Sequence, residues 1–172
     1  MIIKHIEVKT LKILEDMGII QASDIDVFAI AEHLQVDVKP AQLGKDISGL
    51  FVIKEDKPYI RYNGSENDCR INFTIAHELG HFFLHKDIPL FIDKNERIMF
   101  RDAASTTGEI MKEREANAFA AALLMPKPFI ESELQKLVIK NDVTADLADI
   151  FNVSTQAMSF RLSNLDYDFG MF

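Results

Sequence analysis

The 172-residue sequence has no tryptophan, a single cysteine and no long apolar run. With Cys69 alone, no disulfide can form within the chain, which is typical of proteins in a reducing compartment. No segment approaches the ~18–20 consecutive apolar residues of a transmembrane helix. The first residues also lack the apolar centre of a signal peptide, which is ~7–15 residues long. We therefore expect a cytoplasmic protein with no membrane partner.

Basic residues are also scarce. Lys and Arg number 19 against 27 Asp and Glu, so the net charge at pH 7 is −8. A surface of this sign repels nucleic-acid phosphates and anionic lipid, so direct nucleic-acid binding is not expected. Hydrophobic residues make up 48% of the chain and charged residues 27%, as in ordinary globular proteins. The length suffices for a domain with a core of its own.

Apolar spacing predicts helices at both ends of the chain and a small antiparallel sheet between them, which is an α+β fold. The first helix is expected to end at Gly18 and the second to be capped by Ser23 or Asp24. The sheet is expected to hold a short strand with Val36 and Val38 that ends at Pro40, and a hairpin of 47–53 and 58–62. Residues 87–108 are expected to be irregular, with a mixed strand or loop at 91–100. Helices are expected at 3–17, from Ser23 or Asp24 to 34, and at 68–85, 109–125, 129–139, 143–150 and 154–164.

The helix predicted for 68–85 contains the sequence His77-Glu78-Leu79-Gly80-His81, an H-E-x-x-H motif. Residues four apart share one helix face and lie about 6 Å apart along its axis. Two imidazoles on that face can therefore bind one zinc ion through bonds of about 2 Å. Glu78 stands beside the first histidine, where it can act as the general base that deprotonates the attacking water.

A catalytic zinc site needs a third protein ligand. His85 lies about 12 Å along the axis from His77, so we expect it to pack or to contact a ligand rather than bind the metal. Asp87 stands at the third-ligand position of metzincins, but that arrangement needs a glycine where this chain has Leu84. We interpret Cys69 as a buried structural thiol.

The helix predicted for 109–125 offers a better third ligand. Glu113 and Asn117 are one turn apart on the same face, so the glutamate can reach the metal while the asparagine orients a ligand imidazole. Glu115 is the competing ligand, but its side chain points to another face, and we assign Glu113. Small residues would let this helix pack closely against the first: Ala116, Ala118, Ala120, Ala121 and Ala122.

Taken together, these motifs resemble the ImmA/IrrE family of metallo-endopeptidases. The resemblance extends over about residues 20–165. It rests on Phe73–His85 with its H-E-x-x-H core, on Glu113–Asn117 with Phe119-Ala120 and Leu123–Pro126, and on Ala31–Val38 and Ile47–Leu50. It implies a zincin-like peptidase core over residues 1–126 and a helix-turn-helix-like helical subdomain over residues 127–172.

The resemblance also implies the chemistry. His77, His81 and Glu113 would hold Zn²⁺ and Glu78 would be the catalytic base, as in a gluzincin-like protease. Asn117 stands where the related motif often has aspartate. The implied substrate is a helix-turn-helix transcriptional repressor of a mobile element or stress response. We expect its backbone to add as a strand near Ile47–Ile53, and the candidates for the oxyanion donor are Tyr59, Tyr62 and Arg101.

A second interpretation concerns residues 147–162, which read as helix, tight turn, helix, with Ser154 as the cap of the second helix. A DNA-binding or protein-binding regulator would use these helices. Charge argues against DNA, because the segment between Pro128 and Leu165 has three basic residues (Lys136, Lys140, Arg161) and five acidic ones. A zincin fold used only for binding is disfavoured by the intact Glu78.

Overall fold

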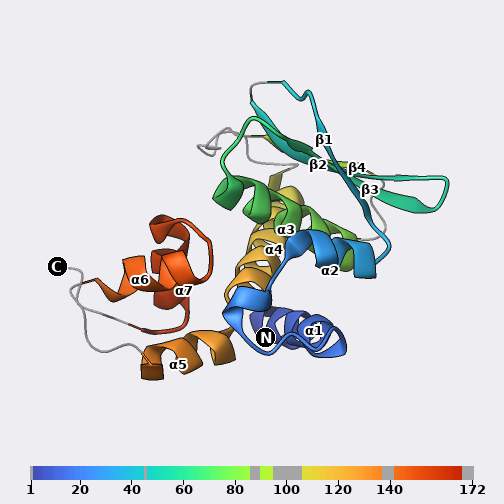
Figure 1. Ribbon diagram of the computed structural model, residues 1–172. Coiled ribbons are helices and arrows are strands. Elements are labelled where there is room, and N and C mark those ends of the chain that lie inside the picture. Colours follow the sequence, from blue (N-terminus) through green and yellow to red (C-terminus); the bar gives the residue numbers. More distant parts are fainter. Residues whose placement is uncertain (1, 45, 86–89, 95–105, 137–141, 168–172) are drawn as a thin grey trace.

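The computed structural model describes residues 2–44, 46–85, 90–94, 106–136 and 142–167, and these ranges form the mixed α+β fold that the sequence predicts (Figure 1). The helices of these ranges are α1 (Ile2–Asp16), a 3₁₀ turn (Ala22–Asp24), α2 (Val27–His33), α3 (Asp68–Leu84), α4 (Thr106–Leu124), α5 (Lys127–Lys136), α6 (Val143–Ile150) and α7 (Thr155–Asn164). The strands are β1 (Asp37–Ala41), β2 (Ile47–Lys54), β3 (Lys57–Asn63) and β4 (Leu90–Lys94). In these ranges no helix has the length and apolarity needed to cross a bilayer.

The sheet has the strand order β1-β3-β2-β4. The expected hairpin is confirmed: β2 and β3 are antiparallel, and Glu55 and Asp56 between them both have positive φ, as a two-residue hairpin turn of matching twist requires. The expectation of a wholly antiparallel sheet is wrong for one pair, because β1 pairs with β3 and runs parallel to it.

The same strand order corrects the expected substrate position. β2 pairs with β3 on one side and with β4 on the other, so Gly49–Val52 are paired on both sides and present no edge. Among the described strands, the edges are β1 and β4. Pro40, at which this strand was expected to end, lies within β1, as the edge position allows.

The N-terminal helices begin and end at residues with identifiable capping roles. Gly18 follows α1 with φ +69°, a left-handed conformation that favours glycine and ends the helix as predicted. The predicted caps of α2 are wrong, because Ser23 and Asp24 belong to the 3₁₀ turn. Asp26 caps α2 instead, and its carboxylate accepts hydrogen bonds from the backbone amides of Phe28 and Ala29.

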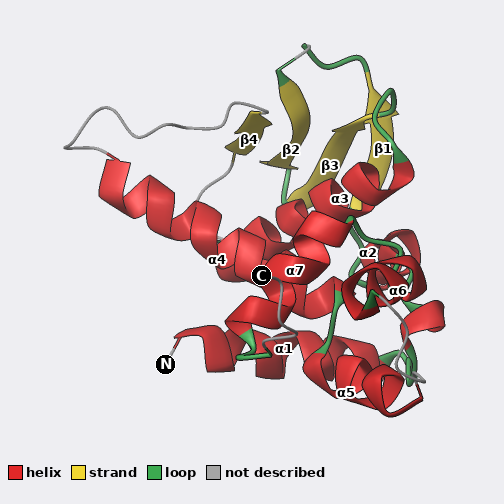
Figure 2. Ribbon diagram, turned by 90° about the vertical axis from the view of Figure 1, so that its left-hand side faces the viewer, coloured by secondary structure: helices red, strands yellow, loops and turns green. Residues whose placement is uncertain are grey.

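Helix α3 lies between the sheet and α4, so the motif helix is covered on both sides (Figures 1 and 2). The crossing of α3 and α4 is very close: a Cβ atom added at Gly80 would lie 3.0 Å from Ala116 Cα and 3.1 Å from its carbonyl oxygen. The prediction that small residues allow close packing is thereby confirmed. Residues 74–81 of α3 are all buried between the sheet and α4.

Helices α5–α7 lie together and apart from the sheet, with α5 farthest from it (Figures 1 and 2). The helix–turn–helix pattern is confirmed locally: α6 covers residues 143–150 and Ser154 Oγ accepts from the Ala157 amide at the start of α7. Arg161 of α7 is 4% exposed and joins this region to the rest. Its guanidinium makes two hydrogen bonds of 2.6 and 3.0 Å to the Glu7 carboxylate and a third to the Met125 carbonyl oxygen. The division of the chain into two domains between residues 126 and 127 stays a prediction.

Candidate metal centre

The two histidines of the H-E-x-x-H motif lie in the middle of α3, a helix that Asn67 caps at its N-terminus. Both are buried, with 3% of His77 and 1% of His81 exposed. Their Nε2 atoms are 3.0 Å apart. One helix turn therefore directs the two imidazoles to the same point, as the i, i+4 spacing predicts.

Glu113 reaches this point from α4. Its Oε2 lies 3.2 Å from His77 Nε2 and its Oε1 lies 3.3 Å from His81 Nε2. One ligand atom from each of the three residues can be chosen so that all lie within 4.8 Å of one another. The Glu113 side chain is 41% exposed, so the cluster is open toward solvent on the carboxylate side. These residues can together hold one metal ion.

The protonation of this cluster suits a cation. Burial alone would raise the pKa of Glu113, but hydrogen bonds and charge from His77 and His81 outweigh it and lower that pKa from 4.5 to about 2. For His81, burial has the largest effect and lowers its pKa below 6.5. Metal ligation requires an ionised carboxylate and neutral imidazoles, and both conditions favour binding near neutral pH.

Asn117 lies one turn after Glu113 on α4 and contacts the far side of the first imidazole. Its Oδ1 is 2.9 Å from His77 Nδ1. Because Nε2 of His77 faces the cluster, Nδ1 carries the proton and donates it to the amide oxygen when a metal is bound. The structure thus brings Asn117 to the place that the sequence spacing predicts.

Glu78 is fully buried beneath strand β2. A Cβ atom at Gly49 would lie 3.3 Å from Glu78 Oε1 and 2.4 Å from Thr74 Cγ2, and contacts as short as the second do not occur in real structures. Strand β2 therefore approaches the motif helix so closely that only glycine fits at position 49. Gly49 lies in the Ile47–Leu50 stretch that carries the family resemblance, but the sequence alone does not indicate this role.

His85 and Glu115 form a pair that the sequence pattern did not predict. His85 follows α3, its Nδ1 lies 3.1 Å from His81 Nδ1, and its Nε2 lies 2.9 Å from Glu115 Oε2. His85 thus contacts a motif histidine, one of its two expected roles, and Glu115 points away from the cluster, as expected. The sequence signals for these contacts were the positions of His85, one helix turn after His81, and of Glu115, close to Glu113 on the same helix.

The remaining sequence candidates lie elsewhere or cannot be placed. Cys69 is half-buried rather than buried, and its Sγ lies 3.6 Å from Asn152 Oδ1, outside the histidine cluster. Tyr59 lies under the Arg61 guanidinium and Tyr62 packs edge-on against a phenylalanine of α2. Asp87 and Arg101 lie outside the described residues.

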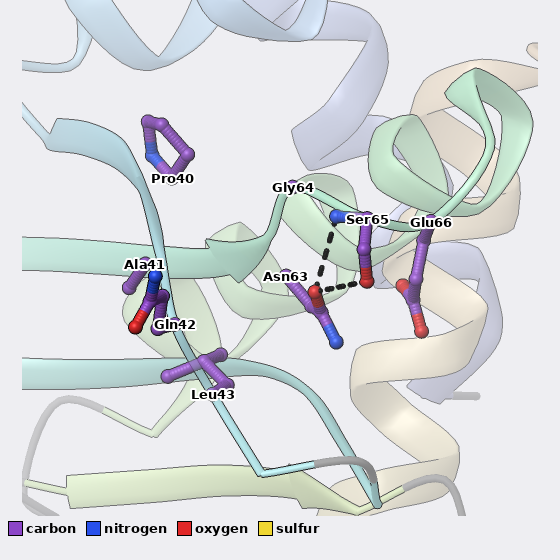
Figure 3. A pocket seen from close by; sticks show the side chains of 8 residues that line it. All are labelled: Pro40, Ala41, Gln42, Leu43, Asn63, Gly64, Ser65 and Glu66. Atoms are coloured by element: carbon purple, nitrogen blue, oxygen red, sulfur yellow. Dashed lines mark hydrogen bonds between the residues drawn. The ribbon is translucent and has the colours of Figure 1, made fainter.

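A polar network that the sequence did not reveal connects the start of β2 with α3. The buried Ser48 donates a hydrogen bond of 2.9 Å to Glu66 Oε1 and accepts two from Arg70. Glu66 also borders an open pocket of about 840 Å³ at the end of the sheet (Figure 3). The pocket is lined by Pro40, Ala41, Gln42, Leu43, Asn63, Gly64, Ser65 and Glu66. None of the clustered residues lines it, so it is separate from the candidate metal centre.

Comparisons with known proteins agree with this geometry. The model of a peptidase family, described as the IrrE N-terminal-like domain, matches residues 31–163. An uncharacterized immunity region protein 2 of Bacillus phage phi105 is 28% identical over 74% of this chain and 79% of its own. Metallopeptidase ImmA of Bacillus subtilis is 28% identical over 81% and 76%. The radiation response metalloprotease IrrE of Deinococcus radiodurans is 31% identical over 60% of this chain and 30% of its own length.

Proposed function

This chain belongs to the ImmA/IrrE family of metallopeptidases, and on that premise we propose that it is a zinc-dependent endopeptidase. We further propose that it acts in the cytoplasm on one specific protein, a helix-turn-helix repressor of a mobile element or stress response. His77, His81 and Glu113 hold the zinc in this proposal, and Glu78 is the catalytic base.

The observation that carries the proposal is the spacing of the three ligand atoms. Ligands of a tetrahedral zinc ion, with bonds of about 2.0–2.1 Å, lie about 3.3 Å from one another. The two Nε2 atoms lie 3.0 Å apart, and each faces its own Glu113 oxygen: His77 Nε2 lies 3.2 Å from Oε2 and His81 Nε2 lies 3.3 Å from Oε1. Two imidazoles and one carboxylate are also a frequent donor set of catalytic zinc sites, with the fourth position left for water or substrate.

Zinc, when bound, supplies Lewis acidity toward the scissile carbonyl and the attacking water. Glu78 takes the proton from that water and returns it to the leaving amine. The close approach of Gly49 restricts the Glu78 carboxylate to one place, and Asn117 holds the His77 ring through its Nδ1 proton. Each of these residues thus has a separate task in the hydrolysis of a peptide bond.

Support for a repressor substrate comes from the names of two relatives and from the net charge of this chain. Two relatives are named an immunity region protein and the metallopeptidase ImmA. The net charge of −8 suits a partner that binds DNA and is therefore basic. We place the substrate backbone beside β4, because in the described part of the chain β4 pairs only with β2 and contacts α3.

The alternative of a DNA-binding regulator has less support. Arg161 is the one basic residue in the sequence of α7, and its guanidinium is buried against Glu7 and Met125. A recognition helix without an exposed cation cannot make the phosphate contacts on which docking to DNA depends. We therefore propose that α6 and α7 support the peptidase or help to dock its protein substrate.

The test of the metal assignment is zinc stoichiometry. The purified protein should bind one zinc ion per chain, and Glu113→Ala should bind it more weakly, while Glu109→Ala on the exposed face of α4 should bind it as the wild type does. A wild-type protein that takes up no zinc, or a Glu113→Ala variant with unchanged affinity, would contradict the proposal.

A further inference from the structure

His85 is a buried histidine whose two ring nitrogens are both engaged, although it is not one of the clustered residues. It is 7% exposed. Its Nδ1 faces His81 Nδ1 at 3.1 Å, and its Nε2 faces Glu115 Oε2 at 2.9 Å. The row His81, His85, Glu115 therefore leads from the candidate metal centre to a carboxylate on α4.

The hydrogen bonds in this row can run in only one direction when a metal is bound. His81 Nε2 faces His77 and Glu113, so it is the ligand atom, and the proton of a neutral His81 must be on Nδ1. His85 Nδ1 then has to accept that proton's hydrogen bond. Its own proton is consequently on Nε2, which donates to the Glu115 carboxylate.

The corresponding contact of the other imidazole is different. His77 Nδ1 meets the neutral amide oxygen of Asn117 directly. Asn117 stands where a carboxylate is often found in the related motif, so the partner of His77 Nδ1 in this contact is an uncharged amide. Glu115 supplies a carboxylate on the His81 side, through His85. Asn117 and Glu115 both belong to α4, which also carries Glu113.

We infer that His85 and Glu115 are positioning residues of the zinc site, acting in series to fix the tautomer and orientation of His81 and to make its Nε2 a stronger ligand. The inference rests on the proposed zinc site. Residues that hold a ligand histidine in this way typically change metal affinity about 10–100-fold when removed. Neither residue belongs to the cluster of His77, His81 and Glu113.

The experiment measures zinc affinity by competition with a chromophoric chelator, using the full chain in metal-free form. His85→Leu fills the buried space with an apolar side chain and removes both hydrogen bonds, and we expect about 10–100-fold weaker zinc binding. His85→Gln should recover most of this loss, because its amide oxygen can accept from His81 and its amide NH₂ can donate to Glu115. Glu115→Ala, at a side chain that is 25% exposed, should lose affinity without loss of fold. His33→Leu, at an exposed histidine of α2, is the control.

A double-mutant cycle distinguishes a relay from two separate packing effects. Combining His85→Leu with Glu115→Ala should weaken zinc binding no more than His85→Leu alone, because the two residues act in series. Combining His85→Leu with Asn117→Ala should multiply the two losses, because these residues anchor different imidazoles. Absorption of the cobalt(II)-substituted protein should change in His85→Leu and return toward the wild-type spectrum in His85→Gln.

The possible results separate this inference from the proposed function. If the wild type binds zinc and His85→Leu and Glu115→Ala bind it equally well, the relay is refuted and the zinc site stands. Multiplicative losses for His85→Leu and Glu115→Ala, or no recovery in His85→Gln, would also refute it. A wild type that does not bind zinc would refute the proposed function itself.

Discussion

Replacing Gly80 by alanine tests whether the α3–α4 crossing sets the geometry of the site. In an open helix this change stabilises by about 1 kcal/mol, because alanine has the higher helix propensity. At Gly80 the new Cβ would meet Ala116 Cα at 3.0 Å, its carbonyl oxygen at 3.1 Å and Phe119 Cβ at 3.1 Å. Two of these atoms belong to the backbone and cannot move aside separately.

Such overpacking costs about 1–3 kcal/mol, so Gly80→Ala should lower the free energy of unfolding by about 0–2 kcal/mol overall. Gly108→Ala is the matched control, since Gly108 is an exposed residue of α4 whose added Cβ would meet nothing within 4 Å. The control should gain up to about 1 kcal/mol. The difference between the two variants, about 1–3 kcal/mol, is the cost of separating the helices.

The assay is urea denaturation of the metal-free proteins, followed by zinc titration. Because α3 carries His77 and His81 while α4 carries Glu113, separating the helices should also weaken zinc binding in Gly80→Ala and leave Gly108→Ala unaffected. If Gly80→Ala is as stable as Gly108→Ala and binds zinc equally well, the crossing does not set the site geometry and this reasoning is wrong.

Three further predictions follow from the buried groups. Arg161→Leu should lower the free energy of unfolding by about 3 kcal/mol, because it removes the charged partner of Glu7, whose side chain is only 19% exposed. A loss below 1 kcal/mol in urea denaturation would show that the ion pair does not stabilise the fold. Lowering the pH from 7 to 5 should destabilise the metal-free protein, because burial holds the pKa of His81 below 6.5, so the unfolded chain binds a proton that the folded chain does not; His81→Gln should flatten this dependence, and an equally steep curve would contradict the assignment. Gly49→Ala should abolish substrate cleavage while zinc stays bound, because the new methyl group would displace the Glu78 carboxylate; cleavage at the wild-type rate would disprove the contact.

The local parts of the site could be predicted from the sequence, because they depend on helix periodicity. The spacing of His77 and His81 places both on one face, and the spacing of Glu113 and Asn117 does the same on α4. The alanines of α4 predicted the close crossing. Each of these predictions needs only the helix itself and the identity of its residues.

The sheet could be predicted less well, because strand patterns do not specify which strands become neighbours. The hairpin of β2 and β3 has a turn signal in its own residues, but nothing in the sequence shows that β1 joins beside β3 rather than β2. The substrate was therefore assigned to a strand that proved to lie inside the sheet. Pairing between strands far apart in sequence depends on tertiary packing.

The contact of His85 with His81 and Glu115 depends on where α3 ends. His85 has left the helical conformation, with φ −129° and ψ 42°, while its amide still donates to the His81 carbonyl oxygen. A distance along an ideal helix axis cannot place a ring beyond the last turn. Sequence spacing left His85 out of the predicted ligand set, and in the structure His85 lies outside the cluster of His77, His81 and Glu113.

The central claim is that Glu78 is the base of a zinc-dependent peptidase, and Glu78→Gln tests it most directly. Zinc content and cleavage of a candidate helix-turn-helix repressor should be measured together in the wild type and this variant. We expect one zinc ion per chain in both proteins and a rate of cleavage at least about 10²-fold lower in the variant, the usual contribution of a general base. A zinc-loaded Glu78→Gln protein that cleaves as fast as the wild type would contradict the claim.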